Sequence, residues 1–375
     1  MRIGIDARYA LRKSRRGIGN YILHLLKEFD LLRPDGVTFY LYGDRAADPG
    51  VMEYFQRTPF VVRILGSANL AWWEQVALPL AARQDGVDLL HCPANIGPVL
   101  FKPCAVVTTI HDVIEFRRKQ FGDKKLSFRH RFSRLYRMGV LPRVARMSDF
   151  VITVSEYSRQ DIAEVLKIPR EKIRVTYEAP NVVVQSPGRT ELFSRLCIED
   201  EDYIFALGAV DRRKNTARLL EAFRRLRAET GASVSLVVAG IERPETFAPS
   251  VGEGVCLFDF LPDEVVAALY KHALFFVYPS LYEGFGLPVL EAMSQGTPVL
   301  CSATTSVGEV AGEGALMCDP EDINDLVVKM RLLLENPGVR KELVERGYRR
   351  AKEFSWGRCA RQTLAVYTEA LGGDE

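Results

Sequence analysis

The sequence predicts an α/β chain with two domains, each built around its own doubly wound parallel sheet. Short apolar runs alternate with amphipathic segments through the first half of the chain, and this alternation restarts in the second half. Strands that alternate with helices form βαβ units, in which the strands lie parallel. The chain has 375 residues, which is more than one ordinary hydrophobic core holds. We therefore expect two similar domains.

In the first half, short apolar runs predict strands, and apolar residues that recur at helical spacing predict helices. Segment 17–32 shows the helical pattern because its apolar side chains return at intervals of three and four residues. The expected strands are 2–7, 38–42, 60–65, 87–91, 105–110 and 150–154, and the expected helices are 17–32 and 72–83.

The alternation breaks at residues 178–189, EAPNVVVQSPGR, which contain two prolines and one glycine. This composition is typical of a linker between domains. We expect a first domain over residues 1–180 and a second over 181–354. In the second domain the expected strands are 203–207, 235–239, 255–258, 274–277, 298–301 and 314–318, and the expected helices are 216–229, 263–271, 288–295 and 323–336.

The segment YPSLYEGFGLPVLE has the pattern of a strand, a glycine turn and a helix start. Glu283 falls on the turn, and Glu291 lies eight residues later in the helix. Gly284 and Gly286 allow close backbone approach, and N–H groups at a helix start favour an anion. Two carboxylates that flank an anion site predict a ligand that is anionic in the middle and rich in hydroxyls at both ends, such as a nucleotide-diphosphate sugar. The alternative is a plain βα connection with a solvated glutamate.

Two other glycine-containing loops follow expected strands. The stretch GAVDRRKN places Arg213 and Lys214 where they can reach a diphosphate. Fixed cations there would lower the barrier as negative charge grows on a departing diphosphate. The stretch RGIGNY places Gly17 and Gly19 at the start of the first helix. A solvated basic loop and an ordinary βα turn are the simpler alternatives.

Polar residues also end two strands of the first domain. In TIHDV, His111 and Asp112 suggest acid–base or metal chemistry, but two ligands do not make a metal site. We expect Asp112 to cap the segment that follows it. In LLHCPAN, His91 and Asn95 are either acceptor-side residues or structural ones. Ser155, in VSEYS, fits the N-cap of a helix.

The stretch YEGFGLPVLE resembles the E-x7-E motif of the family 4 glycosyltransferases, which are retaining enzymes with the two-domain GT-B fold. The match includes Phe285, Leu287 and Pro288, and it extends through RGIGNY, TIHDV, GAVDRRKN and FSWGRCARQTLAVY to cover nearly the whole chain. The resemblance implies two Rossmann-like domains that face each other across a cleft. It also implies that residues 355–375 form a helix crossing back to the first domain.

The resemblance assigns each motif a role. Glu291 would accept hydrogen bonds from ribose hydroxyls, and Glu283 would hold hydroxyls of the donor sugar together with N–H groups of residues 284–287. His111 would orient the donor sugar through a contact to a hydroxyl or through its backbone carbonyl. The residues expected in catalysis are Glu283, His111, Arg213 and Lys214, and those expected to bind the donor are Gly17, Gly19, Arg213, Lys214, Gly284, Phe285, Gly286, Leu287 and Glu291.

One position departs from the pattern of the family. Some members have an arginine directly after the glycine of the basic loop, where this chain has Ala209. One diphosphate contact of those members is therefore either missing here or supplied by Arg212 or Arg213. Glu309, in SVGEVAG, resembles a family loop near the nucleotide base.

The expected function is a retaining hexosyl transfer from a nucleotide-diphosphate sugar, first of all GDP-mannose, to a glycan or polyprenyl-linked glycan of a surface polysaccharide. UDP-glucose, UDP-N-acetylglucosamine and dTDP-rhamnose remain as donors. We expect no cofactor and no catalytic metal, because the nearest match to a D-x-D motif is a turn at residues 200–202. The alternatives are a sugar-nucleotide epimerase or hydrolase on the same fold, and a non-catalytic glycan-binding protein.

The composition limits which partners and which cellular location we expect for this protein. A net charge of +2 gives no reason to expect a nucleic-acid partner, and seven scattered cysteines without a C-x-x-C motif favour a reducing compartment. We find neither a signal-peptide pattern nor an apolar run long enough to cross a bilayer, so we expect a cytoplasmic protein. Residues 117–146 contain eleven Lys or Arg, one acid and interleaved aromatics. This segment predicts contact with an anionic membrane surface, at the inner face of the plasma membrane, with a partly buried Arg-rich helix as the alternative.

Overall fold

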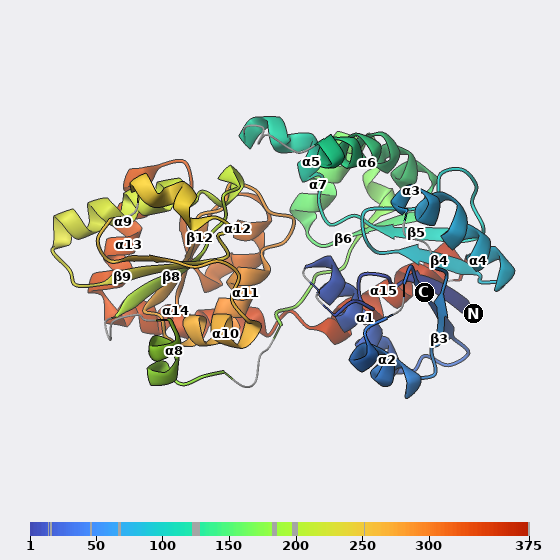
Figure 1. Cartoon of the computed structure of the whole chain (residues 1–375), viewed down its shortest axis with the longest axis horizontal. Helices are drawn as coiled ribbons and strands as arrows, with labels where there is room; N and C mark the ends of the chain where they lie inside the picture. The colour runs from blue at the N-terminus through green and yellow to red at the C-terminus, as the bar shows by residue number, and fades with distance from the viewer. Residues whose placement is uncertain are drawn as a thin grey trace. The chain divides into compact units, whose positions relative to one another are not determined.

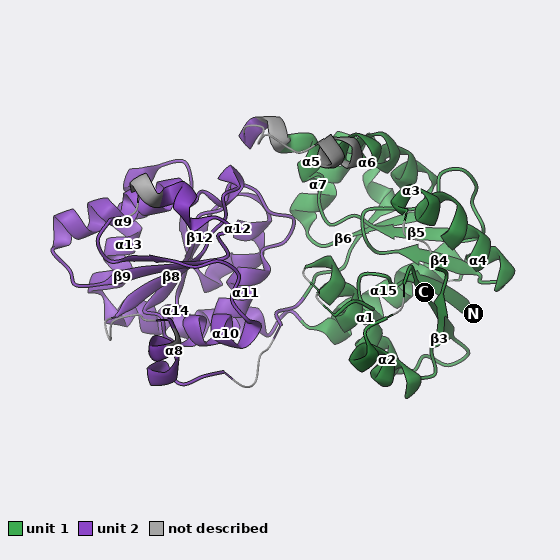
Figure 2. Ribbon diagram, in the orientation of Figure 1, with its two compact units in different colours: residues 1–119, 123–178, 355–375 green, residues 120–122, 179–354 purple. Residues whose placement is uncertain are grey.

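The structure is a computed structural model that describes all residues except 14, 16, 46, 67–68, 122–127, 182–185, 197–201, 251 and 374–375. Figure 1 gives its elements, and Figure 2 shows that the chain divides into two compact units. Unit 1 comprises residues 1–119, 123–178 and 355–375, and unit 2 comprises residues 120–122 and 179–354. The division after Glu178 falls within the expected linker.

Unit 1 is built on a parallel sheet of seven strands in the order β3-β2-β1-β4-β5-β6-β7. The order reverses between β1 and β4, which is where ligands bind in doubly wound folds, beyond the carboxyl ends of the strands. The strands are β1 (Arg2–Asp6), β2 (Thr38–Gly43), β3 (Val61–Ile64), β4 (Leu89–Cys92), β5 (Ala105–Thr109), β6 (Phe150–Thr153) and β7 (Ile173–Val175).

The helices of unit 1 connect these strands. They are α1 (Ile18–Leu32), α2 (Pro49–Gln56), α3 (Leu70–Trp72), α4 (Leu78–Gln84), α5 (Ile114–Arg117), α6 (Phe128–Met147), α7 (Glu156–Leu166) and α15 (Trp356–Ala370). The helix expected at 72–83 is interrupted by a π-helical turn, Trp73–Ala77, a feature that periodicity alone does not reveal. The segment after unit 2 joins unit 1 as α15, where Trp356 stacks on His24 of α1 with ring centroids 4.8 Å apart.

Unit 2 has a parallel sheet of six strands in the order β10-β9-β8-β11-β12-β13. The strands are β8 (Tyr203–Leu207), β9 (Ser235–Ala239), β10 (Val255–Leu257), β11 (Phe275–Tyr278), β12 (Val299–Ser302) and β13 (Leu316–Cys318). The helices are α8 (Arg189–Leu196), α9 (Thr216–Thr230), α10 (Asp263–His272), α11 (Leu287–Ser294), α12 (Thr305–Ala311), α13 (Ile323–Glu335) and α14 (Pro337–Ala351).

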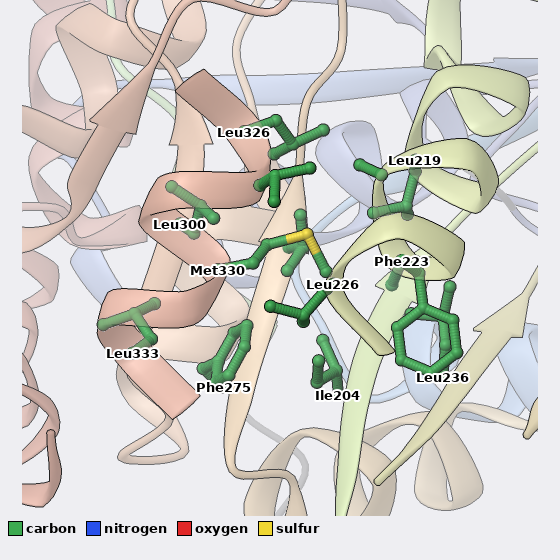
Figure 3. Packing of buried hydrophobic residues seen from close by; sticks show 14 of the residues in the cluster. Ile204, Leu219, Phe223, Leu226, Leu236, Phe275, Leu300, Leu326, Met330 and Leu333 are labelled. Atoms are coloured by element: carbon green, nitrogen blue, oxygen red, sulfur yellow. The ribbon is translucent and has the colours of Figure 1, made fainter. Parts of the chain in front are cut away.

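Both faces of this second sheet are covered by helices, so its four central strands β9, β8, β11 and β12 are almost completely buried, whereas the edge strands β10 and β13 are partly exposed. On one face, side chains of α9 and α13 converge on the strands, with Met330 lying between the two helices (Figure 3). On the other face, Phe205 and Phe276 of the strands meet Tyr270 of α10, with ring centroids 5.1 and 4.9 Å apart. A sheet packed in this way is a rigid base for the loops at its carboxyl edge.

Most of the expected elements are confirmed with ends shifted by one or two residues, and one expected loop is wrong. Residues 305–311, which hold Glu309, form α12 rather than a loop. The run SVGEVA is short, and the N-cap residue Thr304 makes no side-chain cap hydrogen bond, so the sequence carries little sign of a helix. The N-cap expected at Ser155 is confirmed, because its Oγ accepts from the N–H of Ser158 at 3.0 Å.

Candidate functional site

Three loops of unit 2 meet at the carboxyl edge of its sheet, and hydrogen bonds tie them together. The loop after β8 and the loop after β11 are joined by the N–H of Leu281, which donates to the carbonyl oxygen of Arg213 at 2.8 Å. Asn215, in the left-handed region at φ 59°, donates from Nδ2 to the carbonyl oxygen of Pro279 at 3.0 Å. Ser306 of α12 donates to the carbonyl oxygen of Glu283 at 2.8 Å. The backbone around Glu283 is therefore fixed from both sides.

Glu283 is the centre of this edge, and its carboxylate accepts from four side chains. Lys214 Nζ, Tyr278 OH and Ser280 Oγ lie 2.8, 2.9 and 2.6 Å from Oε1, and Arg213 Nη1 lies 3.2 Å from Oε2. Lys214 also donates to Tyr278 and lies over its ring. The fold thus brings Glu283 next to Arg213 and Lys214, which lie 70 and 69 residues before it in the chain.

The charge of Glu283 is set by these neighbours. Burial alone would raise the pKa of its carboxyl group, but Lys214, Arg213 and the Ser280 hydrogen bond outweigh burial and hold the pKa at about 2. Glu283 is therefore an anion at every physiological pH. An ionised carboxylate in a largely buried position accepts strongly from hydroxyl groups, which is the chemistry that sugar recognition requires.

The helix start predicted beside Glu283 is present. Gly286 precedes α11 with φ 117°, a conformation that favours glycine, and α11 begins at Leu287 with a proline in its first turn. The first N–H groups of a helix have no partner within the helix and carry partial positive charge. Phe285 is buried and packs edge-on against Phe354 at 6.0 Å, which anchors the turn. The loop geometry is therefore suited to an anion next to Glu283.

Glu291 lies about one helical turn after the start of α11. Its Oε1 accepts from Asn181 Nδ2 at 3.4 Å. Tyr270 is near enough for Glu291 to help burial raise the pKa of the tyrosine hydroxyl. Asn181 belongs to the linker region, and no local pattern around it indicates a contact with Glu291.

In unit 1, Gly17 and Gly19 line a cavity of about 640 Å³ at the carboxyl edge of the sheet, together with Asn95 and Asp112. Gly17 precedes α1 with φ 32°. A Cβ at Gly19 would lie 2.9 Å from the carbonyl oxygen of Tyr9, so only glycine lets the helix approach this loop. A volume of this size is typical of small-molecule sites.

His111 and Asn95 lie together at the ends of β5 and β4. The N–H of His111 donates to Asn95 Oδ1 at 2.8 Å, and Asn95 has φ 56°. The expected cap at Asp112 is confirmed, because its Oδ1 accepts from the N–H of Ile114 at 3.0 Å. Both ring nitrogens of His111 have partners within the protein, Glu178 and the carbonyl oxygen of Pro93, each at 3.1 Å.

His91 is completely buried, and its contacts agree with the structural role that was the alternative to an acceptor-side role. Its Nδ1 lies 2.6 Å from Tyr367 OH of α15, and its Nε2 lies 2.8 Å from Thr109 Oγ1. Burial, with a contribution from His111, lowers the pKa of His91 to about 3, so the ring is neutral. This histidine joins α15 to the sheet and leaves no ring nitrogen for an acceptor.

Sequence reasoning missed three residues of these sites. Tyr278 and Ser280 both precede the glycine loop and donate hydrogen bonds to Glu283, and the strand-end position of YPS was the signal for both. Glu178 was assigned only to the linker, and nothing in its sequence context indicates the contact with His111.

Comparison with known proteins assigns the family. A model described as Glycosyltransferase Family 4 matches residues 15–179, and one described as Glycosyl transferases group 1 matches residues 188–350. The MMP alpha-(1->4)-mannosyltransferase of Mycolicibacterium hassiacum is 30% identical over 312 residues, which are 79% of this chain and 74% of that protein. The chain belongs to glycosyltransferase family 4. A second relative of this glycosyltransferase, O-antigen chain mannosyltransferase B of Escherichia coli, is 29% identical over 383 residues, with 94% of this chain and 95% of that protein covered.

Solved structures show that the fold is GT-B. Sucrose-phosphate synthase from Thermosynechococcus elongatus matches with a TM-score of 0.73 and 20% identity, and 99% of each chain is covered. HepE of Anabaena, solved with UDP and glucose, matches with a TM-score of 0.70 and 14% identity, covering 98% of this chain and 100% of that one. The predicted fold class and the predicted glycosyltransferase activity are both confirmed.

Among the residues that the structure describes, no three His, Cys, Asp or Glu side chains gather closely enough to hold a metal ion. Within the same residues, every helix is too short or too polar to span a bilayer.

Proposed function

We propose that this glycosyltransferase is a retaining mannosyltransferase that uses GDP-mannose and extends a glycan, free or polyprenyl-linked, in the synthesis of a surface polysaccharide. The observation that carries the proposal is the ionised Glu283 held by Arg213 and Lys214 beside the start of α11. This arrangement offers one strong acceptor for sugar hydroxyls next to cations and N–H groups for phosphate. The relatives named as mannosyltransferases support mannose as the sugar.

In this proposal each group acts where charge changes during transfer. Arg213, Lys214 and the start of α11 take up the negative charge that grows on the departing diphosphate, which lowers the barrier. Glu283 holds hydroxyls of the donor sugar, and Glu291 accepts from the ribose. The acceptor hydroxyl attacks the face that the diphosphate leaves, and the diphosphate receives its proton. No metal and no cofactor takes part.

The cavity of unit 1 is the proposed place for the acceptor on the side of Asn95, whereas Gly17 and Gly19, which also line it, keep their proposed role in binding the donor. Its apolar walls include Ile18 and Phe116. Sugar rings have apolar faces and polar edges, so a mixed lining of this kind suits them.

We expect GDP-mannose to stabilise the purified chain more than UDP-glucose, UDP-N-acetylglucosamine or dTDP-rhamnose does. At equal concentration, a ligand that binds only the folded state raises Tm more the tighter it binds, so a thermal-shift series ranks the donors. GDP release is then measured with and without a mannose-containing glycan acceptor. Release that requires the acceptor supports transfer, whereas free mannose formed without acceptor would favour a hydrolase or epimerase. If the chain binds glycan but turns over no donor, the result would indicate a non-catalytic glycan-binding protein.

We also propose that residues 117–146 bring the enzyme to the inner face of an anionic membrane. In the described part, Leu135 of α6 is 68% exposed, while Arg134 and Arg137 turn to Glu115 at 3.4 and 3.1 Å. The most basic stretch, including Lys125, lies outside the described residues, as do the side chains of Arg129 and Arg131.

Replacing Lys125, Arg129 and Arg131 by Glu is expected to abolish sedimentation with vesicles that contain anionic lipid. Each basic residue near such a surface contributes about 1 kcal/mol, and three reversals oppose binding as well. Neutral phosphatidylcholine vesicles are the control. Equal sedimentation of the variant and the parent chain with anionic vesicles would remove the membrane proposal.

A further inference from the structure

The imidazole of His111 is enclosed by three partners, which come from α1, the loop after β4 and the segment after β7. Nδ1 faces Glu178 Oε1, and Nε2 faces the carbonyl oxygen of Pro93, each at 3.1 Å. The ring lies edge-on to Tyr21 of α1, with centroids 4.8 Å apart and planes at 89°. Only 8% of the residue is exposed.

These contacts determine the protonation of the ring. A carbonyl oxygen can only accept, so Nε2 carries a proton. An ionised carboxylate also only accepts, so the contact with Glu178 favours a second proton on Nδ1, which is the imidazolium form of the ring. Burial opposes the charge, but the hydrogen bond and charge of Glu178 outweigh it, and the net effect is a raised pKa for His111.

The other titratable groups around the ring do not change this picture. Asp112 also favours the charged ring. His91 is neutral, since its pKa is lowered to about 3, and the Cys359 thiol is neutral, since burial raises its pKa to about 12. Burial raises the pKa of Tyr21 well above its ordinary value, so its hydroxyl stays protonated.

Glu178 has an unusual place in the chain. It is the last residue of the central segment of unit 1, directly before the segment that begins unit 2, and its side chain is 7% exposed. Its carboxylate reaches the turn after β5, which is 67 residues away in sequence. The start of the linker is thereby joined to the turn that contains His111 and Asp112, and the same turn is bound by Asn95 through the N–H of His111.

We propose that Glu178 is a positioning residue for glycosyl transfer, acting through the ring of His111. It fixes the imidazolium between its own carboxylate and Pro93, and with it the main chain of residues 110–112 at the edge of the unit 1 cavity. His111 then meets the donor sugar through its main-chain carbonyl and not through a ring nitrogen. This inference rests on the proposed function, because the turn matters for transfer only if a donor sugar binds against it.

The test compares Glu178→Gln with Glu178→Asp and with Glu171→Gln, which changes an exposed glutamate of the same unit. In Glu178→Gln we expect kcat to fall about tenfold or more with a small change in the donor KM, since small misplacements near a reacting centre have effects of this size. The pH at which His111 loses its proton should fall by about one unit or more, because an opposite charge is removed. The basic limb of the rate profile should move with it. Glu178→Asp should restore the profile in part, and Glu171→Gln should match the parent enzyme.

Two readouts separate this inference from the proposed function. Imidazole NMR signals, assigned by the loss of one set in His111→Gln, report the titration of His111 without any activity. A wild-type chain that transfers sugar, together with a Glu178→Gln enzyme of unchanged kcat and pH profile, would overturn the positioning role. A chain that turns over no donor would overturn the proposed function and with it the positioning role. In that case the NMR titration still tests the ion pair between Glu178 and His111. If His111 titrates at the same pH in the parent chain and in Glu178→Gln, the ion pair is contradicted.

Discussion

The Glu283→Gln variant is expected to lose transfer activity by about a hundredfold to a thousandfold in kcat, which is the loss typical of removing one preorganised electrostatic contact. Glutamine keeps the size of the side chain but removes the charge that Lys214 and Arg213 offset. Its amide also cannot accept at both positions that Oε1 and Oε2 occupy. The rate of GDP release with acceptor measures this loss.

The control for this variant is Glu335→Gln, an exposed glutamate at the end of α13. Both variants should keep the circular dichroism of the parent chain, although Glu283→Gln is expected to have the lower Tm because it leaves two cations without their carboxylate. Because the pKa of Glu283 is about 2, the parent enzyme should not lose activity through this group above about pH 4. Turnover by Glu283→Gln at the parent rate would show that the carboxylate takes no part in the reaction.

The Lys214→Ala variant is expected to lower kcat about a hundredfold, with a smaller effect on the binding of a neutral sugar. Its ammonium group binds Glu283 at 2.8 Å and stands on the loop proposed to meet the diphosphate. Its removal has two effects: the departing diphosphate loses one fixed cation that stabilises it, and Glu283 loses one of the hydrogen bonds that hold it in place. Steady-state kinetics with GDP-mannose, together with the Kd of GDP, would measure both effects.

A Lys214→Arg enzyme tests whether charge alone is enough. It keeps the positive charge but replaces a compact ammonium by a planar fork, so we expect only partial recovery. Lys271→Ala, at the exposed end of α10, removes a cation far along the chain from the loop and should behave as the parent does. If Lys214→Ala binds GDP and turns over donor as well as Lys271→Ala does, the basic loop does not hold the diphosphate.

The sheets and the glycine loop could be predicted because they depend on local patterns. Strands of parallel sheets are continuous apolar runs, as in YIFAL and SLVVA, and these gave β8 and β9 with their observed ends. The turn EGFG followed by a proline predicted a helix start, and α11 begins at Leu287, one residue before the expected start. Both Glu283 and the basic pair follow predicted strands, so they were expected at the carboxyl edge of the sheet, and the structure shows that their strands, β11 and β8, are neighbours.

The remaining parts depend on contacts between distant segments, which a single sequence does not show. The π-helical turn at Trp73–Ala77 is held by such contacts, since Trp73 Nε1 donates to Asp6 Oδ2 at 3.1 Å. Glu178 looked like a linker residue because its partner His111 is far away in the sequence. His91 looked like a candidate site residue because a histidine at a strand end is often exposed, and only the position of Tyr367 shows that it is buried.

The most direct test of the account is a crystal structure of the chain with GDP. We expect the two phosphates to lie against the start of α11, within hydrogen-bond distance of Arg213 and Lys214, with the ribose hydroxyls at Glu291. A nucleotide bound elsewhere on the protein, or at this place with its phosphates turned away from both cations, would contradict the central claim.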